Sequence, residues 1–283
     1  MSHVLVWGES ALAARLREAL RPQLVNDQPE VVLLAAQSWQ TASLVTQLRT
    51  ALPFDATLPV IVSLQTGRGN RQTIDAIFGA GHGLVGTVGA DGGLILADDH
   101  PQSATVAALL KRAGFTVTGA PADSIEWSSV FWGLQANAIS AILDIPPENV
   151  YDDPALFAIE HAQLLEALGI IRASGARLID LPGVKVRAMA RQAGWIPRQW
   201  LARLLRKYPR PPSLREELSQ QKRRSEAAYL NGAIALRADE LRLRAPVNHA
   251  LALTVTDIAE GRALWSQYKG NPSLLEATIR LAR

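Results

Sequence analysis

His3-Val-Leu-Val-Trp-Gly8, near the start of the chain, is a short apolar run that ends in glycine. Ser10-Ala-Leu-Ala-Ala-Arg-Leu-Arg-Glu-Ala-Leu20 follows at once, with helical spacing and strong helix formers. These two segments predict a strand, a tight turn and a helix. The apolar runs Glu30–Ala36 and Leu58–Leu64 repeat the pattern, with helices expected near 39–52 and 70–78. Continuous apolar runs are typical of parallel strands buried on both faces, so this half is predicted to be α/β.

The remainder of the first half is rich in glycine. Between Gly79 and Gly93 the glycines separate short β-branched runs, which predicts hairpin-like strands and turns. A helix is expected at 103–113 and a strand at 115–118, and Gly119-Ala-Pro-Ala-Asp123 is the predicted linker. We therefore place the first domain at residues 1–122.

From Ile125 onward the apolar spacing becomes helical, which predicts an all-α domain over residues 123–283. Only about ten residues separate the first helix from the second recognisable strand. The helices are expected at 125–143, 153–170, 176–193, 197–207, 213–239, 247–260 and 272–282.

Composition limits the chemistry that the chain can perform. Its 283 residues contain no cysteine, which excludes disulfides, thiolate catalysis and cysteine-ligated zinc. The five histidines show no metal-ligand spacing, so no metal is expected. The start of the chain lacks the pattern of a signal sequence, and no apolar run approaches the roughly 20 residues that span a bilayer. We expect a cytoplasmic protein.

The first turn, Gly8-Glu-Ser10-Ala-Leu-Ala13, is a candidate phosphate site. It keeps the first glycine of a G-x-G-x-x-G fingerprint but has Ser10 at the second position and Ala13 at the third. A side chain at Ser10 and the charge of Glu9 both oppose close approach of a pyrophosphate. No Lys or Arg occurs between Pro22 and Leu48 to hold a 2′-phosphate. Dinucleotide binding and a fold remnant both remain open as interpretations of this turn.

Polar residues follow two of the predicted strands. Gln37-Ser-Trp-Gln40 ends the second strand and Gln65-Thr-Gly-Arg-Gly-Asn70 ends the third. Open α/β sheets bind ligands at the carboxyl ends of their strands, so these residues are candidates for a binding rim. Loop formation alone is the alternative.

Taken in order, these segments resemble the ketopantoate reductase (2-dehydropantoate 2-reductase) family. Ala36–Gln40 is similar to that family's lysine-containing strand end and Gln65-Thr66-Gly67 to its Q-N-G loop. Further similar segments are Trp127–Ile142, Pro212-Ser213-Leu214, Ser225–Gly232 and Ala245–Asn248. The resemblance implies a shortened Rossmann-like parallel-sheet domain followed by an all-helical domain of the 6-phosphogluconate dehydrogenase C-terminal-like type.

The resemblance also implies site residues. The family places a lysine and two asparagines at i, i+4 and i+8 of one long helix, where this chain has Ser129, Gly133 and Asn137. Serine cannot replace the lysine as general acid, so a matching reaction should be impaired by at least about 10²–10⁴-fold. Ser129 and Asn137 remain the candidate catalytic residues, and Asn137 is also a candidate substrate contact.

Other site residues follow from the same resemblance. Gln37 stands where the strand-end lysine would be and Thr66 where the loop asparagine would be, which makes both candidate cofactor contacts together with Gly8, Ser10 and Ala13. Ser213 corresponds to a substrate position and Glu226 to a cofactor ribose position. Alternatively, Ser213 opens a capping box with Glu216, and Glu226 pairs with Lys222.

The segment 185–224 combines basic residues with tryptophan, a pattern that can indicate nucleic-acid or membrane-surface binding. However, Trp195, Ile196, Trp200, Leu201, Leu204 and Leu205 form one apolar stripe that a helical core would bury. We therefore expect neither nucleic acid nor membrane as a partner.

Two hypotheses follow. In the first, the chain is a diverged reductase that transfers hydride from NADP or NAD to a small 2-oxo acid or related carbonyl, bound in a cleft between the domains. In the second, it is a catalytically inactive homologue that serves as a ligand-binding or scaffolding protein. A homodimer through the helical domain is expected in either case.

Overall fold

The structure is a computed structural model that describes residues 3–25, 28–54, 56–207 and 213–282. The chain forms two compact units. The first comprises Met1–Ser129 with Ile179–Val184, and the second comprises Val130–Leu178 with Lys185–Arg283.

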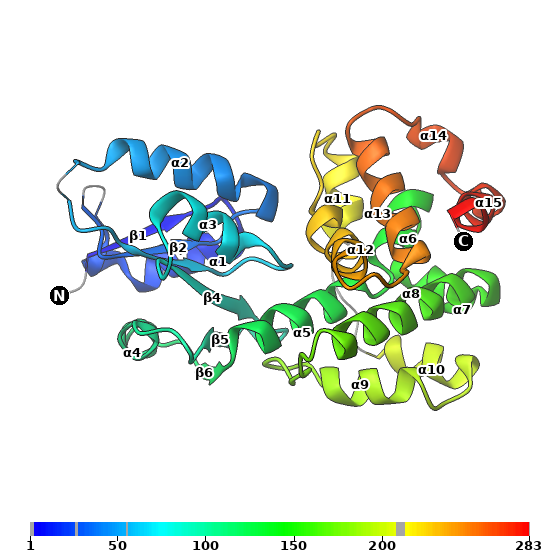
Figure 1. Cartoon of the computed structure of the whole chain (residues 1–283), viewed down its shortest axis with the longest axis horizontal. Helices are drawn as coiled ribbons and strands as arrows, with labels where there is room; N and C mark the ends of the chain where they lie inside the picture. Colours follow the sequence, from blue (N-terminus) through cyan, green and yellow to red (C-terminus); the bar gives the residue numbers. More distant parts are fainter. Residues whose placement is uncertain (1–2, 26–27, 55, 208–212, 283) are drawn as a thin grey trace. The chain divides into compact units, whose positions relative to one another are not determined.

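The first unit contains a six-stranded sheet in the order β1-β2-β3-β4-β5-β6 (Figure 1). Neighbouring strands are parallel except β4 and β5, which are antiparallel. The predicted α/β class is therefore confirmed. The elements are β1 (Val4–Trp7), α1 (Ala11–Ala19), β2 (Val31–Leu34), α2 (Thr41–Ala51), β3 (Val60–Ser63), α3 (Asn70–Phe78), β4 (Gly83–Val88), β5 (Leu94–Ala97), α4 (Ser103–Arg112) and β6 (Val117–Ala120), with short 3₁₀ turns at Arg21–Gln23 and Ser38–Gln40.

Strand β2 explains the three-layer packing of this unit. Its four residues are all buried, and alternate side chains point to opposite faces of the sheet. Val31 and Leu33 join the core cluster that includes Leu16 of α1 and Leu109 of α4. Val32 and Leu34 join the cluster that includes residues of α2 and α3. Helices therefore cover both faces, which is why the strands are apolar throughout.

Strand β1 lies at an edge of the sheet. Among the described residues its only strand partner is β2, and beyond it there is a single isolated bridge between Val4 and Leu24. In the usual dinucleotide fold the first strand is central and two more strands follow on its other side. The short interval after the first helix thus leaves that side of the sheet unbuilt in the described part of the chain.

The second unit is helical, as predicted. Its helices are α6 (Asn137–Leu143), α7 (Pro147–Asp152), α8 (Pro154–Ala173), α9 (Val186–Ala193), α10 (Arg198–Leu205), α11 (Ser213–Ser219), α12 (Asn231–Glu240), α13 (Pro246–Ala259), α14 (Trp265–Tyr268) and α15 (Pro272–Ala282), with a 3₁₀ turn η3 at Glu226–Tyr229. Helix α5 (Ala122–Leu134) begins in the first unit and ends in the second.

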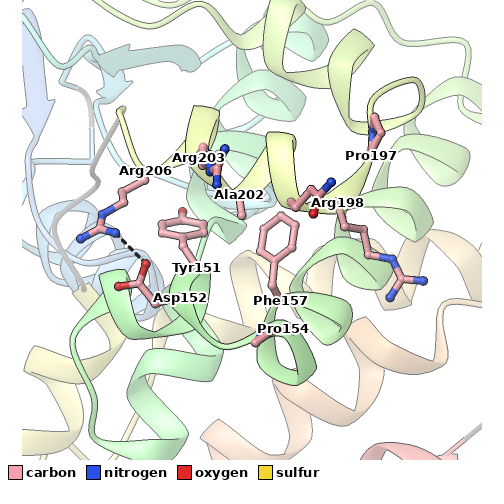
Figure 2. Close-up of a pocket in the computed structure, with 10 residues that line it drawn as sticks. Tyr151, Asp152, Pro154, Phe157, Pro197, Arg198, Ala202, Arg203 and Arg206 are labelled. Carbon is pink, nitrogen blue, oxygen red and sulfur yellow. Dashed lines mark hydrogen bonds and ion pairs between the residues drawn. The ribbon is translucent and has the colours of Figure 1, made fainter.

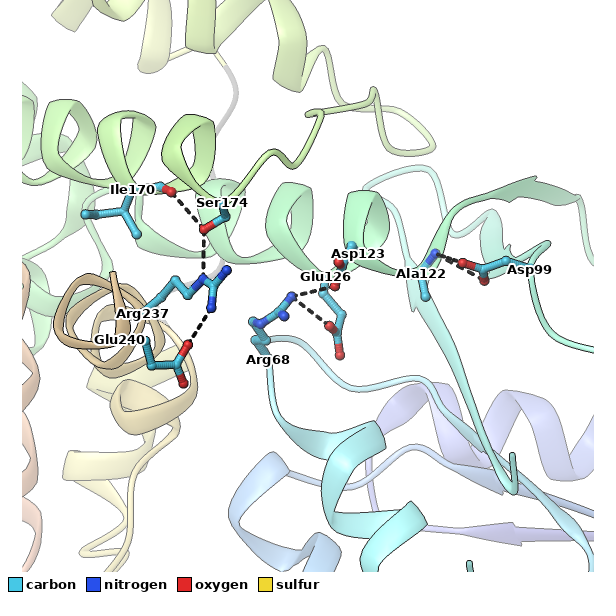
Figure 3. Close-up of polar contacts among 9 residues, drawn as sticks. All are labelled: Arg68, Asp99, Ala122, Asp123, Glu126, Ile170, Ser174, Arg237 and Glu240. Atoms are coloured by element: carbon cyan, nitrogen blue, oxygen red, sulfur yellow. Dashed lines mark hydrogen bonds and ion pairs between the residues drawn. The ribbon is translucent and has the colours of Figure 1, made fainter. Parts of the chain in front are cut away.

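Several predicted helix bounds are wrong. The expected helix 213–239 is divided into α11, η3 and α12, and residues 176–185 precede α9 instead of belonging to it. The predicted linker 119–123 is also wrong, because β6 ends at Ala120 and α5 begins at Ala122. The Asp99 carboxylate accepts the Ala122 N–H at 3.2 Å, which caps α5 directly after the strand (Figure 3).

The expected continuous helix 125–143 is broken between α5 and α6. Ala136 has a left-handed φ of 48°, and its N–H is accepted by Oε1 of Glu160 at 2.9 Å. Glu160 is fully buried in α8, where Gln163 also donates to it at 2.5 Å. Because the helix is interrupted, the expectation that Ser129, Gly133 and Asn137 form one stripe of a single helix is wrong.

Helix α8 is long and apolar enough to cross a membrane by length and composition alone, contrary to the expectation that no segment approaches this size. More than half of its apolar window is buried inside the unit. It also carries Glu160 and Gln163, which are both fully buried and hydrogen-bonded to neighbouring segments. These features are those of the central helix of a protein core.

The apolar stripe predicted around α10 is only partly buried. Leu201 and Leu205 have exposures of 0% and 1%, whereas Trp195 and Trp200 are 88% and 56% exposed. Both tryptophans therefore lie at the surface, and the interpretation of the whole stripe as core is wrong for them.

Candidate functional site

The turn between β1 and α1 requires glycine at its first position. Gly8 has φ of 127°, and a Cβ atom there would lie 2.4 Å from the Ala35 carbonyl oxygen. Any other residue would be strained and would clash with the end of β2. The glycine is thus explained by packing within the chain itself.

Ser10 caps the helix that follows. Its Oγ accepts the Ala13 N–H at 3.1 Å and donates to the Ala35 carbonyl at 2.7 Å. The Ser10 hydroxyl therefore already accepts a hydrogen bond from one of the N–H groups that would otherwise bind a pyrophosphate. Among the described residues, the N–H groups of Ala11 and Leu12 have no acceptor.

The polar residues after β2 and β3 do meet, as their positions at the strand ends suggest. Gln65 is at the centre: its Nε2 donates to the Gln37 carbonyl and to Thr41 Oγ1, both at 2.9 Å, and its Oε1 accepts from Ser63 at 3.0 Å. Thr41 also donates to Asn70 at 2.9 Å. Gln65 and Asn70 are about 5% and 3% exposed, so this is a buried network instead of an open rim.

Gln37 and Thr66 take part in this network through their backbone. The Gln37 carbonyl accepts from Gln65, and its side chain forms a capping box with Gln40. The Thr66 carbonyl accepts from the Ser38 hydroxyl at 2.7 Å. These contacts stabilise the loops at the carboxyl edge of the sheet.

Arg68 follows this network and joins it to α5. Its Nη1 lies 2.9 Å from Oδ1 of Asp123 and 3.0 Å from Oε2 of Glu126 (Figure 3). Its guanidinium also lies over the Trp127 ring, 4.6 Å from the centroid. Cation–π contact and two carboxylates together hold the arginine in one orientation.

Glu126 is the buried member of this cluster, with a side chain 3% exposed, whereas that of Asp123 is 60% exposed. Burial raises the pKa of Glu126 to about 7, although Arg68 and Arg71 act to lower it. A carboxyl group with this pKa is both protonated and ionised near neutral pH, as a proton donor or acceptor requires.

Glu126 and Ser129 line a cavity of about 10 Å³ together with Gln65, Asn70 and Arg71. This volume holds about one water molecule. Ser129 is 2% exposed, and its Oγ has no hydrogen-bond partner among the described residues. An unpartnered buried hydroxyl that shares a cavity with a titratable carboxyl is a candidate for holding a water molecule.

Asn137 and Ser213 meet in the second unit. The Asn137 amide donates to Ser213 Oγ at 3.1 Å, and its carbonyl oxygen accepts the Leu214 N–H at 3.1 Å. The amide therefore caps α11 from 76 residues away. These two hydrogen bonds give Asn137 a structural role at the start of α11, beside its proposed role toward a substrate.

Glu226 lies in η3 and is 7% exposed. Its backbone N–H donates to Oε2 of Glu217 at 3.0 Å, and Ser225 donates to the same oxygen at 2.9 Å. Burial and the neighbouring Glu226 raise the pKa of Glu217 to about 7. The two carboxyl groups form a buried acidic pair that the sequence did not reveal.

The sequence placed Arg68 in the candidate binding rim, but it did not reveal the pairing of Arg68 with Glu126. The two residues are 58 positions apart, and Glu126 belongs to no recognised motif. The available signal was a lone acid in the apolar run Ile125–Trp132, because an acid in a buried helix needs a partner. In the described ranges no group of three or more His, Asp or Glu side chains is arranged to hold a metal.

Comparison with known proteins places this geometry in context. Residues 122–259 match the family model described as Ketopantoate reductase PanE/ApbA C terminal. No curated protein matches the chain in sequence.

Solved structures share the fold over 92% of this chain. A PanE/ApbA family ketopantoate reductase from Ralstonia eutropha JMP134 has a TM-score of 0.69 at 21% identity, with 99% of that chain covered. A dimeric ketopantoate reductase from Staphylococcus aureus has a TM-score of 0.71 at 15% identity, with 100% covered. A D-mandelate dehydrogenase in complex with NADH has a TM-score of 0.70 at 12% identity, with 99% covered.

The chain therefore shares with these solved structures a fold in which a mostly parallel sheet is followed by a helical domain. Residues 122–259 therefore belong to the ketopantoate reductase PanE/ApbA family as its C-terminal domain, and the chain as a whole shares the fold of solved structures of that name. The resemblance and the fold class expected from the sequence are confirmed.

Proposed function

We propose that this protein is a nicotinamide-dependent reductase of a small 2-oxo acid or related carbonyl, in which Glu126 holds the proton that a lysine supplies in the family. The observation that carries the proposal is the contact between the buried Glu126 carboxyl and Arg68, beside the unpartnered hydroxyl of Ser129.

Reduction of a carbonyl group needs a hydride at carbon and a proton at oxygen. A bound nicotinamide supplies the hydride. Glu126, with its pKa of about 7, holds a proton on Oε1 or Oε2 in a large fraction of molecules at neutral pH. Ser129 has an unpartnered hydroxyl that can hold the water through which the proton passes.

Arg68 suits the carboxylate of a 2-oxo acid. A guanidinium has five N–H donors, and the two carboxylates that it binds both contact Nη1. When Glu126 is protonated, the charge of Arg68 is less neutralised and its remaining donors favour an anionic substrate. Asn137 and Ser213 are proposed as further substrate contacts.

The fit of the chain to a dinucleotide is uneven. A pyrophosphate would fit the turn at Gly8, where the N–H groups of Ala11 and Leu12 have no partner in the described part of the chain. The further proposed cofactor contacts are Ser10, Ala13, Gln37, Thr66 and Glu226. The described sheet ends at β1, so the side that normally holds the adenosine ribose is not built by strands. We therefore propose weak binding of NADPH or NADH without strong preference between them.

A second candidate function is ligand binding or scaffolding without catalysis. It is favoured by the Ser10 hydroxyl, which already caps α1, and by the polar network around Gln65, which satisfies its own hydrogen bonds. Both features are what a fold retained without its cofactor would show.

The two candidate functions differ in whether the protein oxidises a nicotinamide cofactor in the presence of a 2-oxo acid. Oxidation of NADPH and NADH by the purified protein should be followed at 340 nm with a panel of 2-oxo acids that includes ketopantoate. Turnover that depends on Arg68 and Glu126 supports the reductase. Binding of a 2-oxo acid with no turnover for any member of the panel supports the second function.

A cytoplasmic location and a homodimer formed through the helical unit are part of the same proposal. The dimeric state named for the Staphylococcus aureus relative supports the latter. Light scattering during size-exclusion chromatography tests it, since a mass near 30.6 kDa at micromolar concentration would contradict a dimer.

A further inference from the structure

The second unit carries a cavity of about 620 Å³ that the proposed reductase function does not use. It lies where α7 and the start of α8 face α10 (Figure 2). Its volume is within the range of roughly 300–1,000 Å³ that small-molecule sites occupy.

Two aromatic rings form its apolar surface. Tyr151 and Phe157 pack with ring centroids 6.1 Å apart at 57°, and Phe157 is only 2% exposed. Phe157 is held in turn by His161, whose ring stacks on it at 6.4 Å and whose Nε2 lies 2.8 Å from the Ala193 carbonyl. The aromatic surface is therefore fixed by packing before any ligand binds.

The charge of the lining is strongly positive. Three guanidinium groups line the cavity, those of Arg198, Arg203 and Arg206, against the single carboxylate of Asp152. Asp152 is already bound to Arg206 at 2.6 Å. Arg198 and Arg203 have no carboxylate partner among the described residues, and Arg203 stacks on Trp200 at 5.1 Å. Two positive charges are thus left uncompensated.

The arrangement of these groups is directional. In Figure 2 the rings of Tyr151 and Phe157 form a row, with Arg206 near one end and Arg198 near the other. The Tyr151 hydroxyl points toward the side of Arg203 and has no hydrogen-bond partner among the described residues. Burial, with Glu160 and Glu148 nearby, raises the pKa of Tyr151, so this hydroxyl remains a donor at neutral pH.

We propose that this cavity is a binding site for an organic anion that joins a planar apolar ring to a carboxylate or phosphate group. The ring lies against Tyr151 and Phe157, and the anionic group binds Arg198 or Arg203. Guanidinium groups pair well with both carboxylate and phosphate, and they do so most strongly where one side of the ion pair is shielded from water.

The site can be tested by calorimetry on the full-length protein with four probes. The anionic ring compounds are 2-naphthyl phosphate and 2-naphthoate, and 2-naphthol and inorganic phosphate represent the ring and the anion alone. We expect both anionic ring compounds to bind, and each separate part to bind at least tenfold more weakly. The tighter of the two anionic ring compounds identifies the anionic group.

Variants with opposite expected effects distinguish binding at a charged site from nonspecific adsorption. Arg198→Gln combined with Arg203→Gln should weaken binding of the tighter probe at least tenfold. Asp152→Asn should tighten it several-fold, because Arg206 is then released from its partner. The matched control is Arg223→Gln with Arg280→Gln, which removes the same charge from exposed positions outside the cavity lining.

Three results would overturn the proposal. The first is no binding of either anionic ring compound at millimolar concentration. The second is equal affinity for 2-naphthol, which would indicate apolar adsorption, or for inorganic phosphate, which would indicate a simple ion site. The third is an equal loss of affinity in the cavity variant and in the control variant, which would indicate an effect of net charge alone.

Discussion

Arg68 and Glu126, 58 residues apart in the chain, are joined by an ion pair of 3.0 Å at the carboxyl edge of the sheet. The arginine comes from the loop after β3 and the glutamate from the first turns of α5. Burial of the glutamate outweighs the attraction of the arginine, and so its pKa is raised to about 7. This pair places a proton and a cation side by side, at a cavity that Ser129 also lines, and the resemblance to the family predicts its lysine at Ser129.

Replacement of Glu126 tests the proton source. Glu126→Gln keeps the shape of the side chain and removes its titration, so kcat should fall by about 10²–10⁴-fold. The wild-type kcat should decrease as pH rises through about 7, where the Glu126 carboxyl loses its proton, and the variant should lack this decrease. Asp123→Asn is the control, because Asp123 binds the same arginine but is largely exposed. A variant with the same pH profile as the wild type would exclude this role.

Ser10→Gly tests the turn at the start of α1. The change frees the Ala13 N–H and removes the side chain from the position where a pyrophosphate must approach. We expect tighter dinucleotide binding by several-fold, at a cost in helix stability of only a few tenths of a kcal/mol. Ser10→Ala is the control, since it removes the cap and keeps a Cβ atom. Unchanged affinity in the glycine variant would place the pyrophosphate elsewhere.

Glu160 makes stability dependent on pH. Burial raises its pKa from 4.5 to about 8, so the folded protein binds this proton more tightly than the unfolded chain does. The contribution to stability is fully present below pH 4.5 and is lost as pH rises toward 8. Urea unfolding should therefore show decreasing stability over this interval, and Glu160→Gln should reduce the slope. An equal slope in Glu160→Gln and in the exposed-site control Glu148→Gln would contradict this assignment.

Asn137 anchors α11, and its loss should be visible in stability. Asn137→Ala removes the acceptor of the Leu214 N–H and the donor to Ser213, which should cost about 1–3 kcal/mol for the buried group left unpaired. Ser213→Ala should cost less, and the double variant should cost less than the sum because the two side chains share a hydrogen bond. Additive effects would show that the bond contributes nothing. Urea unfolding followed by circular dichroism measures all three variants.

The sheet could be predicted because its strands are buried on both faces. Val31–Leu34 is apolar at every position for this reason, and the helices between strands have regular spacing. The break between α5 and α6 at Ala136 could not be predicted, because neither Gln135 nor Ala136 is a proline or glycine that would mark a helix end. The contact that holds the break comes from Glu160, 24 residues away. The local sequence pattern therefore predicted one continuous helix, whereas a distant carboxylate stabilises a break within it.

The site was predicted less well than the fold. The polar strand ends were recognised, but sequence could not show that Gln65 turns inward to bind Gln37 and Thr41. Asn137 and Ser213 were both selected, although their contact with each other depends on the packing of α6 against α11. The pairing of Arg68 with Glu126 was missed because an ion pair between distant segments leaves no local pattern.

Binding of NADPH and NADH, measured by calorimetry on the wild-type protein, tests the reductase proposal most directly. We expect dissociation constants in the micromolar to millimolar range for both, with little preference between them, and weaker binding of each than in Ser10→Gly. Absence of binding of either dinucleotide at millimolar concentration would contradict hydride transfer by this chain and leave the ligand-binding function in its place.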